Sequence, residues 1–281
     1  MQNSGNKCNS QCIMCSSVVH MGTDVMSFEL FKKVCDEARI MEIEKMVITG
    51  GEPLLDRGLI EKIRYAKSIG FTYIHMFTNG SLLNEVNSSD IIDSGLDSLT
   101  ISVDSAIKEE YEAIRVGLKY DNLIQNIRRF CNIRKEKQSN KPLLRINMVA
   151  LAQNKNSRAL FIKTFAPYAD IVEIVQSHNF ASIFSGSSYY ESIDEHPRHR
   201  YPCNLMFSKL VVDADGTVRK CSIDYDKRAS LGNVTDQSLY EIWSSERFNN
   251  LRKRMLDYDF SEPGCNACTH CQSWWIDAYA K

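Results

Sequence analysis

Three cysteines lie within eight residues of one another near the start of this chain. They are Cys8, Cys12 and Cys15, in a C-x3-C-x2-C spacing. A thiolate is a soft ligand, and closely spaced thiolates hold zinc or an iron–sulfur cluster. Three protein ligands would leave one iron of a cubane cluster open to bind another molecule. The alternative is a zinc knuckle completed by a distant fourth ligand, although zinc patterns place cysteines in pairs.

A second cysteine group lies in the last third of the chain. Its members are Cys203, Cys221, Cys265, Cys268 and Cys271. Thiolates at these spacings suit an auxiliary iron–sulfur cluster, and they suit a structural Zn²⁺ equally well. The two remaining cysteines, Cys35 and Cys131, stand alone in helix-like segments and are interpreted as buried small apolar residues. Ligand chemistry is therefore concentrated near the two ends of the sequence.

The composition is that of an ordinary globular protein. Of 281 residues, 43% are hydrophobic and 25% are charged, and the formal net charge is −1. This balance gives no indication of a nucleic-acid surface. No apolar run approaches the roughly 20 residues of a membrane span, and the polar N-terminus has no signal-peptide core. Because thiolate clusters need a reducing compartment, we expect a cytoplasmic protein with no nucleic-acid or membrane partner.

Apolar strand-like runs alternate with helical patterns between residues 28 and 176. The predicted strands are Lys45–Thr49, Tyr73–Phe77, Ser98–Val103, Leu144–Leu151 and Ile171–Gln176. The predicted helices are Phe28–Ile43 with Ser27 as N-cap, Ile60–Ile69, Leu83–Ser94, Tyr111–Arg115, Leu123–Lys137 and Ser157–Phe165. Repeated strand–helix units of this kind predict a parallel sheet with helical crossovers.

The last third of the chain has a different pattern. Leu210–Asp213 and Thr217–Lys220 flank Asp215-Gly216, a turn pair typical of β-hairpins. Leu239–Leu256 has the pattern of one long amphipathic helix. The preceding residues 184–199 lack periodicity, which indicates a linker or an active-site loop.

A glycine pair follows the first of the five predicted strands. Gly50-Gly51-Glu52-Pro53 stands 35 residues after Cys15, and glycine lets a backbone approach a ligand closely. Alone, the segment could be an ordinary turn. Together with the C-x3-C-x2-C triplet, it resembles the radical S-adenosylmethionine (SAM) superfamily, which has both segments at these places.

The resemblance implies a fold and a chemistry. The fold is α/β, a partial (β/α)6 TIM-like barrel followed by a small α+β domain with a β-hairpin and a helix. Only seven polar residues precede Cys8, so we expect the first barrel strand to be short, frayed or cut away. The chemistry is reductive cleavage of SAM, bound at a [4Fe-4S] cluster, to a 5′-deoxyadenosyl radical that abstracts hydrogen from a substrate.

The same resemblance implies the residues that bind SAM. They are Met14, Gly50, Gly51, Glu52, Pro53, Thr78, Asn79, Ser102, Asp104 and Arg115. The Gly-Gly-Glu segment would hold the methionyl amino group, Ser102 and Asp104 would lie at the ribose, and Arg115 would meet the carboxylate. Met14 would lie near the adenine. Each single polar residue could instead cap a strand or a helix.

The C-terminal part resembles the twitch domain, a shortened relative of the SPASM domain. This resemblance implies one auxiliary [4Fe-4S] cluster, held by Cys203, Cys221, Cys265 and Cys268. Three roles remain for Cys271: a structural thiol, a ligand in place of Cys268, or a catalytic thiol that donates a hydrogen atom. We expect a barrel domain over residues 1–185 and an auxiliary domain over residues 186–281, and the resemblances cover nearly the entire chain.

Three function classes follow. The first is a radical SAM oxidoreductase that oxidises a small polar molecule, such as an aminocyclitol or a sugar alcohol. The second is an epimerase or peptide-modifying enzyme with a thiol hydrogen donor, and the third is a non-enzymatic iron–sulfur or zinc module. An enzyme would need an electron donor such as flavodoxin or ferredoxin. Candidate substrate contacts, by position, are Gln176, His178, Tyr189, Tyr190, His196, Arg198 and Arg200.

Overall fold

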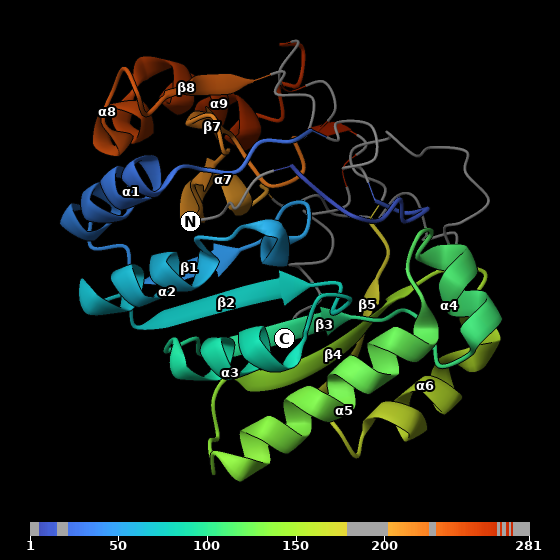
Figure 1. The fold of residues 1–281 in the computed structure, drawn as a ribbon. Coiled ribbons are helices and arrows are strands. Elements are labelled where there is room, and N and C mark those ends of the chain that lie inside the picture. Colours follow the sequence, from blue (N-terminus) through green and yellow to red (C-terminus); the bar gives the residue numbers. More distant parts are fainter. Residues whose placement is uncertain are drawn as a thin grey trace.

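The parallel sheet predicted from the sequence is present. In a computed structural model, which describes residues 6–15, 22–178, 202–224, 229–262, 265, 268–269 and 271, five parallel strands are ordered β1-β2-β3-β4-β5 (Figure 1). They are β1 (Lys45–Ile48), β2 (Tyr73–Thr78), β3 (Ser98–Ser102), β4 (Leu143–Ala150) and β5 (Ile171–Gln176). Every neighbouring pair is parallel. The sheet is open rather than closed, as a partial barrel requires.

Helices connect the strands and cover one face of the sheet (Figure 1). They are α1 (Phe28–Ile40), α2 (Leu59–Ser68), α3 (Glu85–Asp93), α4 (Lys108–Ile114), α5 (Tyr120–Glu136) and α6 (Arg158–Phe165), with 3-10 turns η2 (Pro53–Leu55) and η3 (Lys155–Ser157). The predicted N-cap of α1 is confirmed, because Ser27 Oγ accepts a hydrogen bond of 3.1 Å from Leu30 N.

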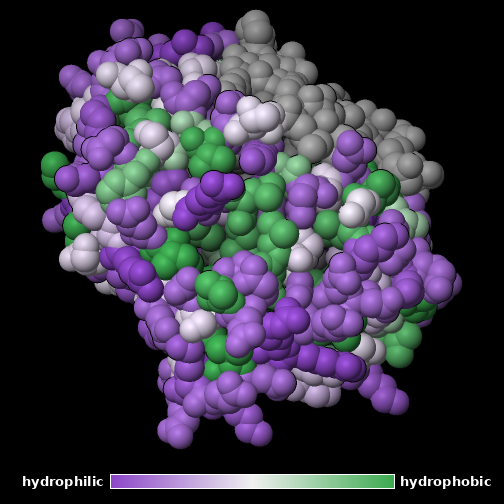
Figure 2. Space-filling view, in the orientation of Figure 1, coloured by the Kyte–Doolittle hydropathy of each residue, from purple (hydrophilic) through white to green (hydrophobic). Residues whose placement is uncertain are grey.

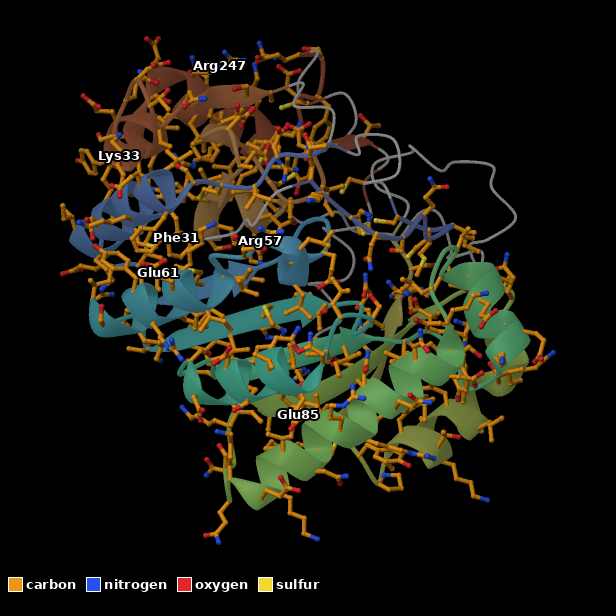
Figure 3. All side chains as sticks on the ribbon, viewed as in Figure 1. Phe31, Lys33, Arg57, Glu61, Glu85 and Arg247 are labelled. Atoms are coloured by element: carbon orange, nitrogen blue, oxygen red, sulfur yellow. The ribbon has the colours of Figure 1, made fainter. Side chains whose placement is uncertain are left out.

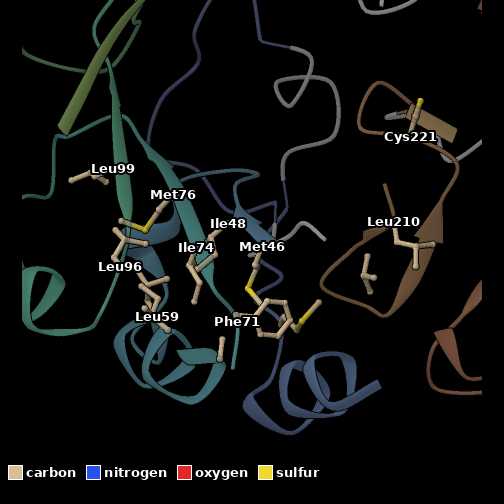
Figure 4. Close-up of a cluster of buried hydrophobic side chains, with 14 of the residues drawn as sticks. Met46, Ile48, Leu59, Phe71, Ile74, Met76, Leu96, Leu99, Leu210 and Cys221 are labelled. Carbon is tan, nitrogen blue, oxygen red and sulfur yellow. The ribbon is translucent and has the colours of Figure 1, made fainter. Parts of the chain in front are cut away.

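The core lies between the sheet and these helices. Alternate strand residues such as Ile74, Met76 and Leu99 are fully buried, and they pack with Leu59 and Phe71 in the cluster of Figure 4. The residues between them point to the opposite, inner face of the sheet, because strand side chains alternate. That inner face leads to the pocket described below.

The segment before Cys8 makes backbone contacts but forms no strand within residues 6–15. Lys7 O accepts a hydrogen bond of 2.8 Å from Glu52 N, and Asn6 N donates one of 3.2 Å to Asp24 O. The chain here lies beside the end of β1, where a sixth barrel strand is expected. Residues 1–5 lie outside the described part.

A second, antiparallel sheet lies in the C-terminal part, with the order β6-β7-β8. Its elements are α7 (Leu205–Ser208), β6 (Val211–Val212), β7 (Thr217–Arg219), β8 (Ser230–Asn233), α8 (Leu239–Ser244) and α9 (Glu246–Leu256). The predicted hairpin is confirmed as β6 and β7, whereas β8 and α7 were not predicted.

The prediction of one helix over Leu239–Leu256 was wrong. Ser245 interrupts it with an extended ψ of 147°, and its hydroxyl accepts a hydrogen bond of 3.2 Å from Phe248 N. A serine that caps a new helix competes with continuation of the old one. Two short helices therefore replace one long helix.

The C-terminal part packs on α1. Glu37 Oε2 accepts a hydrogen bond of 2.7 Å from Leu239 N, at the start of α8, and Lys33 Nζ reaches Val234 O (Figure 3). Buried residues of both parts belong to one hydrophobic cluster. Hydrophilic residues cover most of the face drawn in Figure 2, and none of the helices described has the length and apolarity of a membrane span.

Candidate functional site

The three N-terminal cysteines line a pocket at the carboxyl ends of the first three strands. The pocket has a volume of about 180 Å³, and Cys8, Cys12 and Cys15 lie on its wall. Among its other lining residues are Thr49, Gly51, Thr78, Asn79, Ser102 and Arg115. The structure thus brings the cysteine triplet together with five of the predicted SAM-binding residues. Parallel sheets place their sites at this edge.

The cysteine loop is fixed by its own backbone and by α4. Gln11 N donates a hydrogen bond of 2.8 Å to Val116 O, and Ile13 N donates one of 3.1 Å to Ile114 O. Ser10 Oγ lies 3.4 Å from both Cys8 Sγ and Cys12 Sγ. Sequence reasoning missed this serine, although its place between two cysteines of the triplet was a signal.

The donor set fits a multi-iron cluster. Within the described ranges, no three Cys, His, Asp or Glu side chains converge as ligands of one metal ion. The three thiols line one pocket together with Gly51 and Ser102. Three thiolates in one pocket would suit a [4Fe-4S] cluster that keeps one iron open for another ligand.

Gly51 is required by the close approach of the cysteine loop. Its φ is +50°, and a Cβ at this position would lie only 2.1 Å from Lys7 O. Any larger residue would displace the backbone that leads into Cys8. Gly51 therefore lets the segment after β1 pack against the cysteine loop.

Glu52 lies behind the pocket wall and makes three hydrogen bonds. Its carboxylate accepts them from Thr78 Oγ1 at 2.7 Å, Asn79 N at 2.7 Å and Leu54 N at 3.0 Å. Burial raises the pKa of Glu52, while these hydrogen bonds lower it. Pro53 is also buried and starts η2. Glu52 therefore holds the end of β2 at the pocket.

Asn79 connects this strand end to the cysteine loop. Its Nδ2 donates a hydrogen bond of 2.8 Å to Asn9 Oδ1, and its Oδ1 accepts one of 2.9 Å from Ser81 N. The side chain lines the pocket. Its position after β2 was predicted from the sequence, but its partner Asn9 was not.

Arg115 is held between Asp104 and Cys12. Its Nε lies 2.5 Å from Asp104 Oδ2, and its Nη1 lies 3.5 Å from Cys12 Sγ. Burial disfavours its charge, but Asp104 and the Cys12 thiol raise the pKa of Arg115. Arg115 therefore brings a positive charge next to the cysteine triplet.

Asp104 is fully buried and orients this arginine. It has a φ of +69°, and its Oδ1 accepts a hydrogen bond of 2.7 Å from Val149 N. Asn154, which sequence reasoning missed, donates one of 2.9 Å to Asp104 O. Met14 packs in a small separate cluster with Cys12, Ile114 and Leu151. Neither Asp104 nor Met14 is among the residues that line the pocket.

The second cysteine group is largely buried. Cys203, Cys221, Cys265 and Cys271 are buried, and Cys268 is partly buried. Burial raises the pKa of Cys221 to about 12. Lys220 is 3% exposed, with Nζ 3.6 Å from Asp224 Oδ1, and its charge acts on Cys268, Cys221 and Cys265.

Cys271, whose N donates a hydrogen bond of 3.2 Å to Cys268 O, also has a neighbour outside the cysteine group. Its Sγ is 3.8 Å from Nε2 of His178, which follows β5. The structure thus brings this fifth cysteine together with one predicted substrate contact. Gln176 ends β5 and is exposed. The other predicted substrate contacts, Tyr189, Tyr190, His196, Arg198 and Arg200, lie outside the described residues.

Comparison with known proteins decides the family. The family model of the radical SAM superfamily matches residues 3–150, more than half of the chain. The chain belongs to the radical SAM superfamily. The SPASM model, described as an iron–sulfur cluster-binding domain, matches residues 203–272 and so spans all five C-terminal cysteines. SAM, a [4Fe-4S] cluster and an auxiliary iron–sulfur cluster are therefore the cofactors of this radical SAM enzyme.

Curated relatives match over part of their length. The "GTP 3',8-cyclase" of Thermodesulfovibrio yellowstonii is 34% identical over 129 residues, which are 43% of this chain and 39% of that protein. The "Probable GTP 3',8-cyclase" of Methanothermobacter marburgensis is 35% identical over 109 residues, 38% of this chain and 35% of that protein. The chain thus spans less than two fifths of the length of either relative.

Solved structures share the fold over nearly the whole chain. BtrN in complex with AdoMet and 2-DOIA has a TM-score of 0.62 at 17% identity, covering 96% of this chain and 91% of that one. Streptococcus suis SuiB bound to precursor peptide SuiA has a TM-score of 0.74 at 12% identity, covering 89% and 65%. At these identities the likeness shows the fold alone.

Proposed function

We propose that this radical SAM enzyme is an oxidoreductase that removes two electrons from a small polar molecule, such as an aminocyclitol or a sugar alcohol. The observation that carries the proposal is the second cysteine group, buried and packed in the same core as the barrel. An electron acceptor built into the chain suits an oxidation. BtrN in complex with AdoMet and 2-DOIA shares this fold over 96% of the present chain, so the fold is compatible with a small-molecule substrate.

The N-terminal pocket holds SAM in this proposal. Cys8, Cys12 and Cys15 ligate its cluster, and Gly51, Thr78, Asn79, Ser102 and Arg115 face the pocket. Glu52 holds Thr78 and Asn79 in place, and Asp104 holds Arg115. Gly50 and Pro53 flank Gly51 and Glu52 in the chain, and Met14 precedes Cys15. When bound, SAM and its cluster supply a 5′-deoxyadenosyl radical, and the auxiliary cluster supplies an acceptor for the second electron.

In this proposal, radical formation and electron acceptance belong to different parts of the chain. Residues 1–185 form the radical-generating domain, and residues 186–281 form the auxiliary domain with Cys203, Cys221, Cys265 and Cys268 as ligands. A flavodoxin or ferredoxin donates the electron that starts each turnover. The substrate alcohol loses one hydrogen atom, one proton and one electron, and it becomes a ketone.

Radical cyclisation is the second candidate. The 34–35% identity to GTP 3',8-cyclases favours it, although those matches cover 38–43% of this chain. A cyclase of that kind has to hold a nucleoside triphosphate. The comparisons do not favour epimerisation or peptide modification through Cys271, whose Sγ lies 3.8 Å from His178 Nε2.

Deuterium tracking tests the proposal. The reconstituted enzyme is incubated with SAM, reductant and a cyclitol or sugar alcohol deuterated at the carbinol carbon. Oxidation predicts one deuterium in 5′-deoxyadenosine, a ketone product and no solvent hydrogen in that product. If the enzyme instead converts GTP to a product of the same elemental composition and oxidises no alcohol, the proposed oxidation is wrong and cyclisation is the function.

A further inference from the structure

The inner face of the parallel sheet has a row of polar side chains below the SAM pocket. They are His75 on β2, Thr100 on β3, Arg145 and Asn147 on β4, and Glu173 on β5. The register brings them together, because Arg145 is paired with Thr100 and Asn147 with both Ser102 and Glu173. The opposite face of the same strands is apolar and buried under helices. Polar residues from four neighbouring strands therefore meet on one surface.

Asn147 has a buried acceptor that the described protein does not use. The residue is 7% exposed, and no described residue donates a hydrogen bond to its side-chain oxygen Oδ1. An unsatisfied buried acceptor is costly, and most such groups in native proteins have a partner. A donor from a bound molecule would remove that cost.

Arg145 and Glu173 form a two-point ion pair beside Asn147. Arg145 Nε lies 3.2 Å from Glu173 Oε1, and Nη2 lies 2.7 Å from Oε2. The side chains are 24% and 30% exposed, so the pair is open to a ligand. Because each charge already has its counter-charge, the pair presents both donors and acceptors without a net charge.

His75 adds a neutral group. Its Nε2 lies 2.9 Å from Thr100 Oγ1, and its ring stacks on Phe77 with centroids 4.5 Å apart. Burial, together with the nearby Arg145, lowers the pKa of His75 to about 4. The ring is therefore uncharged at neutral pH. Another cation of the described strands, Lys45 on β1, lines a different groove together with Phe207 and Trp243.

This surface is continuous with the SAM pocket. Phe77 and Ser102 line that pocket with the cysteines. Phe77 is two residues beyond His75 on β2, and Ser102 is two residues beyond Thr100 on β3. Two residues of a strand span about 7 Å, so a molecule on the polar surface would extend to the pocket where the radical forms.

We propose that Asn147, Arg145, Glu173 and His75 form the substrate subsite, and that it takes an uncharged polyol or an amino polyol rather than a phosphate ester. A substrate hydroxyl or amine donates to Asn147 Oδ1. Neighbouring hydroxyls bind the Arg145–Glu173 pair, and an ammonium group binds Glu173. Among the described residues of this surface, the arginine that a triphosphate would meet already has a carboxylate partner. This inference rests on the proposed oxidation and names its substrate class.

Binding to the reconstituted enzyme with SAM tests the subsite without turnover. Isothermal titration with myo-inositol, scyllo-inosamine, glucosamine and GTP compares wild type with Asn147→Ala and Glu173→Gln. The matched control is Asn132→Ala, an exposed asparagine on α5. We expect wild type to bind at least one of the polyols more tightly than GTP, and Asn147→Ala to weaken that binding about tenfold. Asn132→Ala should leave it unchanged.

Glu173→Gln gives a signature that a structural role would not produce. It leaves Arg145 without its counter-charge, so GTP binding should improve about tenfold while binding of the amino polyols weakens. Binding of none of the polyols, or unchanged polyol binding in Asn147→Ala, would overturn the subsite. Oxidation of a deuterated polyol whose KM is the same in wild type and Asn147→Ala would overturn the subsite while leaving the proposed oxidation intact.

Discussion

Gly51 and Lys7 are in contact through their backbones, so that a Cβ on Gly51 would lie 2.1 Å from Lys7 O. The contact joins the strand β1 to the loop of the three N-terminal cysteines. Glu52 N strengthens it with a hydrogen bond of 2.8 Å to the same oxygen. The position of the cysteine loop therefore depends on a residue 36 positions beyond the last cysteine of the triplet.

Gly51→Ala should displace this loop and remove the SAM-binding cluster. Wild type reconstituted anaerobically should contain about eight irons per chain, and the variant about four. Gly58→Ala is the control, because a Cβ there meets nothing closer than 3.5 Å. Iron and zinc are measured by plasma mass spectrometry. Eight irons in Gly51→Ala would show that the contact does not position the loop, and four irons with one zinc in wild type would rule out an auxiliary iron–sulfur cluster.

The auxiliary ligands can be separated by comparing two cysteines. Cys268 is hydrogen-bonded to Cys265 and interacts electrostatically with Lys220. The Sγ of Cys271 lies 3.8 Å from Nε2 of His178. We expect Cys268→Ala to retain about four irons and Cys271→Ala about eight. The reverse pattern would make Cys271 the fourth ligand.

The buried His75 should make stability depend on pH. Its pKa is about 4 in the folded chain and near 6.5 when unfolded, so the unfolded state binds the proton more readily. Its stabilising contribution is present above pH 6.5 and is lost as the pH falls toward 4. Urea unfolding at pH 7.5 and 5.5 should show a smaller loss for His75→Gln than for wild type. Equal losses in both proteins would contradict the neutral, buried ring.

Ser245 caps α9 and separates it from α8. Ser245→Ala should lower the free energy of unfolding by about 1 kcal/mol, because Phe248 N loses its acceptor. Ser244→Ala is the matched control, since Ser244 is exposed and its hydroxyl only donates to Tyr240 O. Its effect should stay within about 0.5 kcal/mol. Denaturant titration measures the free energy of unfolding of both variants. Equal losses in the two variants would show that Ser245 does not act as a cap.

The regular elements were predictable because each follows from a local pattern. Strand periodicity gave all five parallel strands, and Ser27 marked the start of α1. The break at Ser245 was not predicted, although the buried residues change phase there. On one continuous helix, Leu239 and Ile242 would lie on the side opposite Phe248 and Leu251. This change of phase was a sequence signal that the prediction did not use.

The candidate site was predictable in its composition but not in its connections. The spacing of Cys8, Cys12 and Cys15 and the segment Gly50 to Pro53 are local signals. The hydrogen bonds of Glu52 with Asn79 and of Arg115 with Asp104 are not local signals. They join segments that become neighbours only in the folded chain. The alternation of Arg145 and Asn147 along one strand was a signal for the inner polar face that sequence reasoning did not use.

The formation of 5′-deoxyadenosine tests the central claim, that the pocket of Cys8, Cys12 and Cys15 is where SAM is cleaved. Reduced, reconstituted enzyme is incubated with SAM, and the nucleoside is quantified by mass spectrometry in wild type, Cys12→Ala and the control Cys35→Ala, which changes a buried cysteine of α1. We predict cleavage in wild type and in Cys35→Ala, and none in Cys12→Ala. Persistent cleavage by Cys12→Ala would contradict the assignment of the pocket.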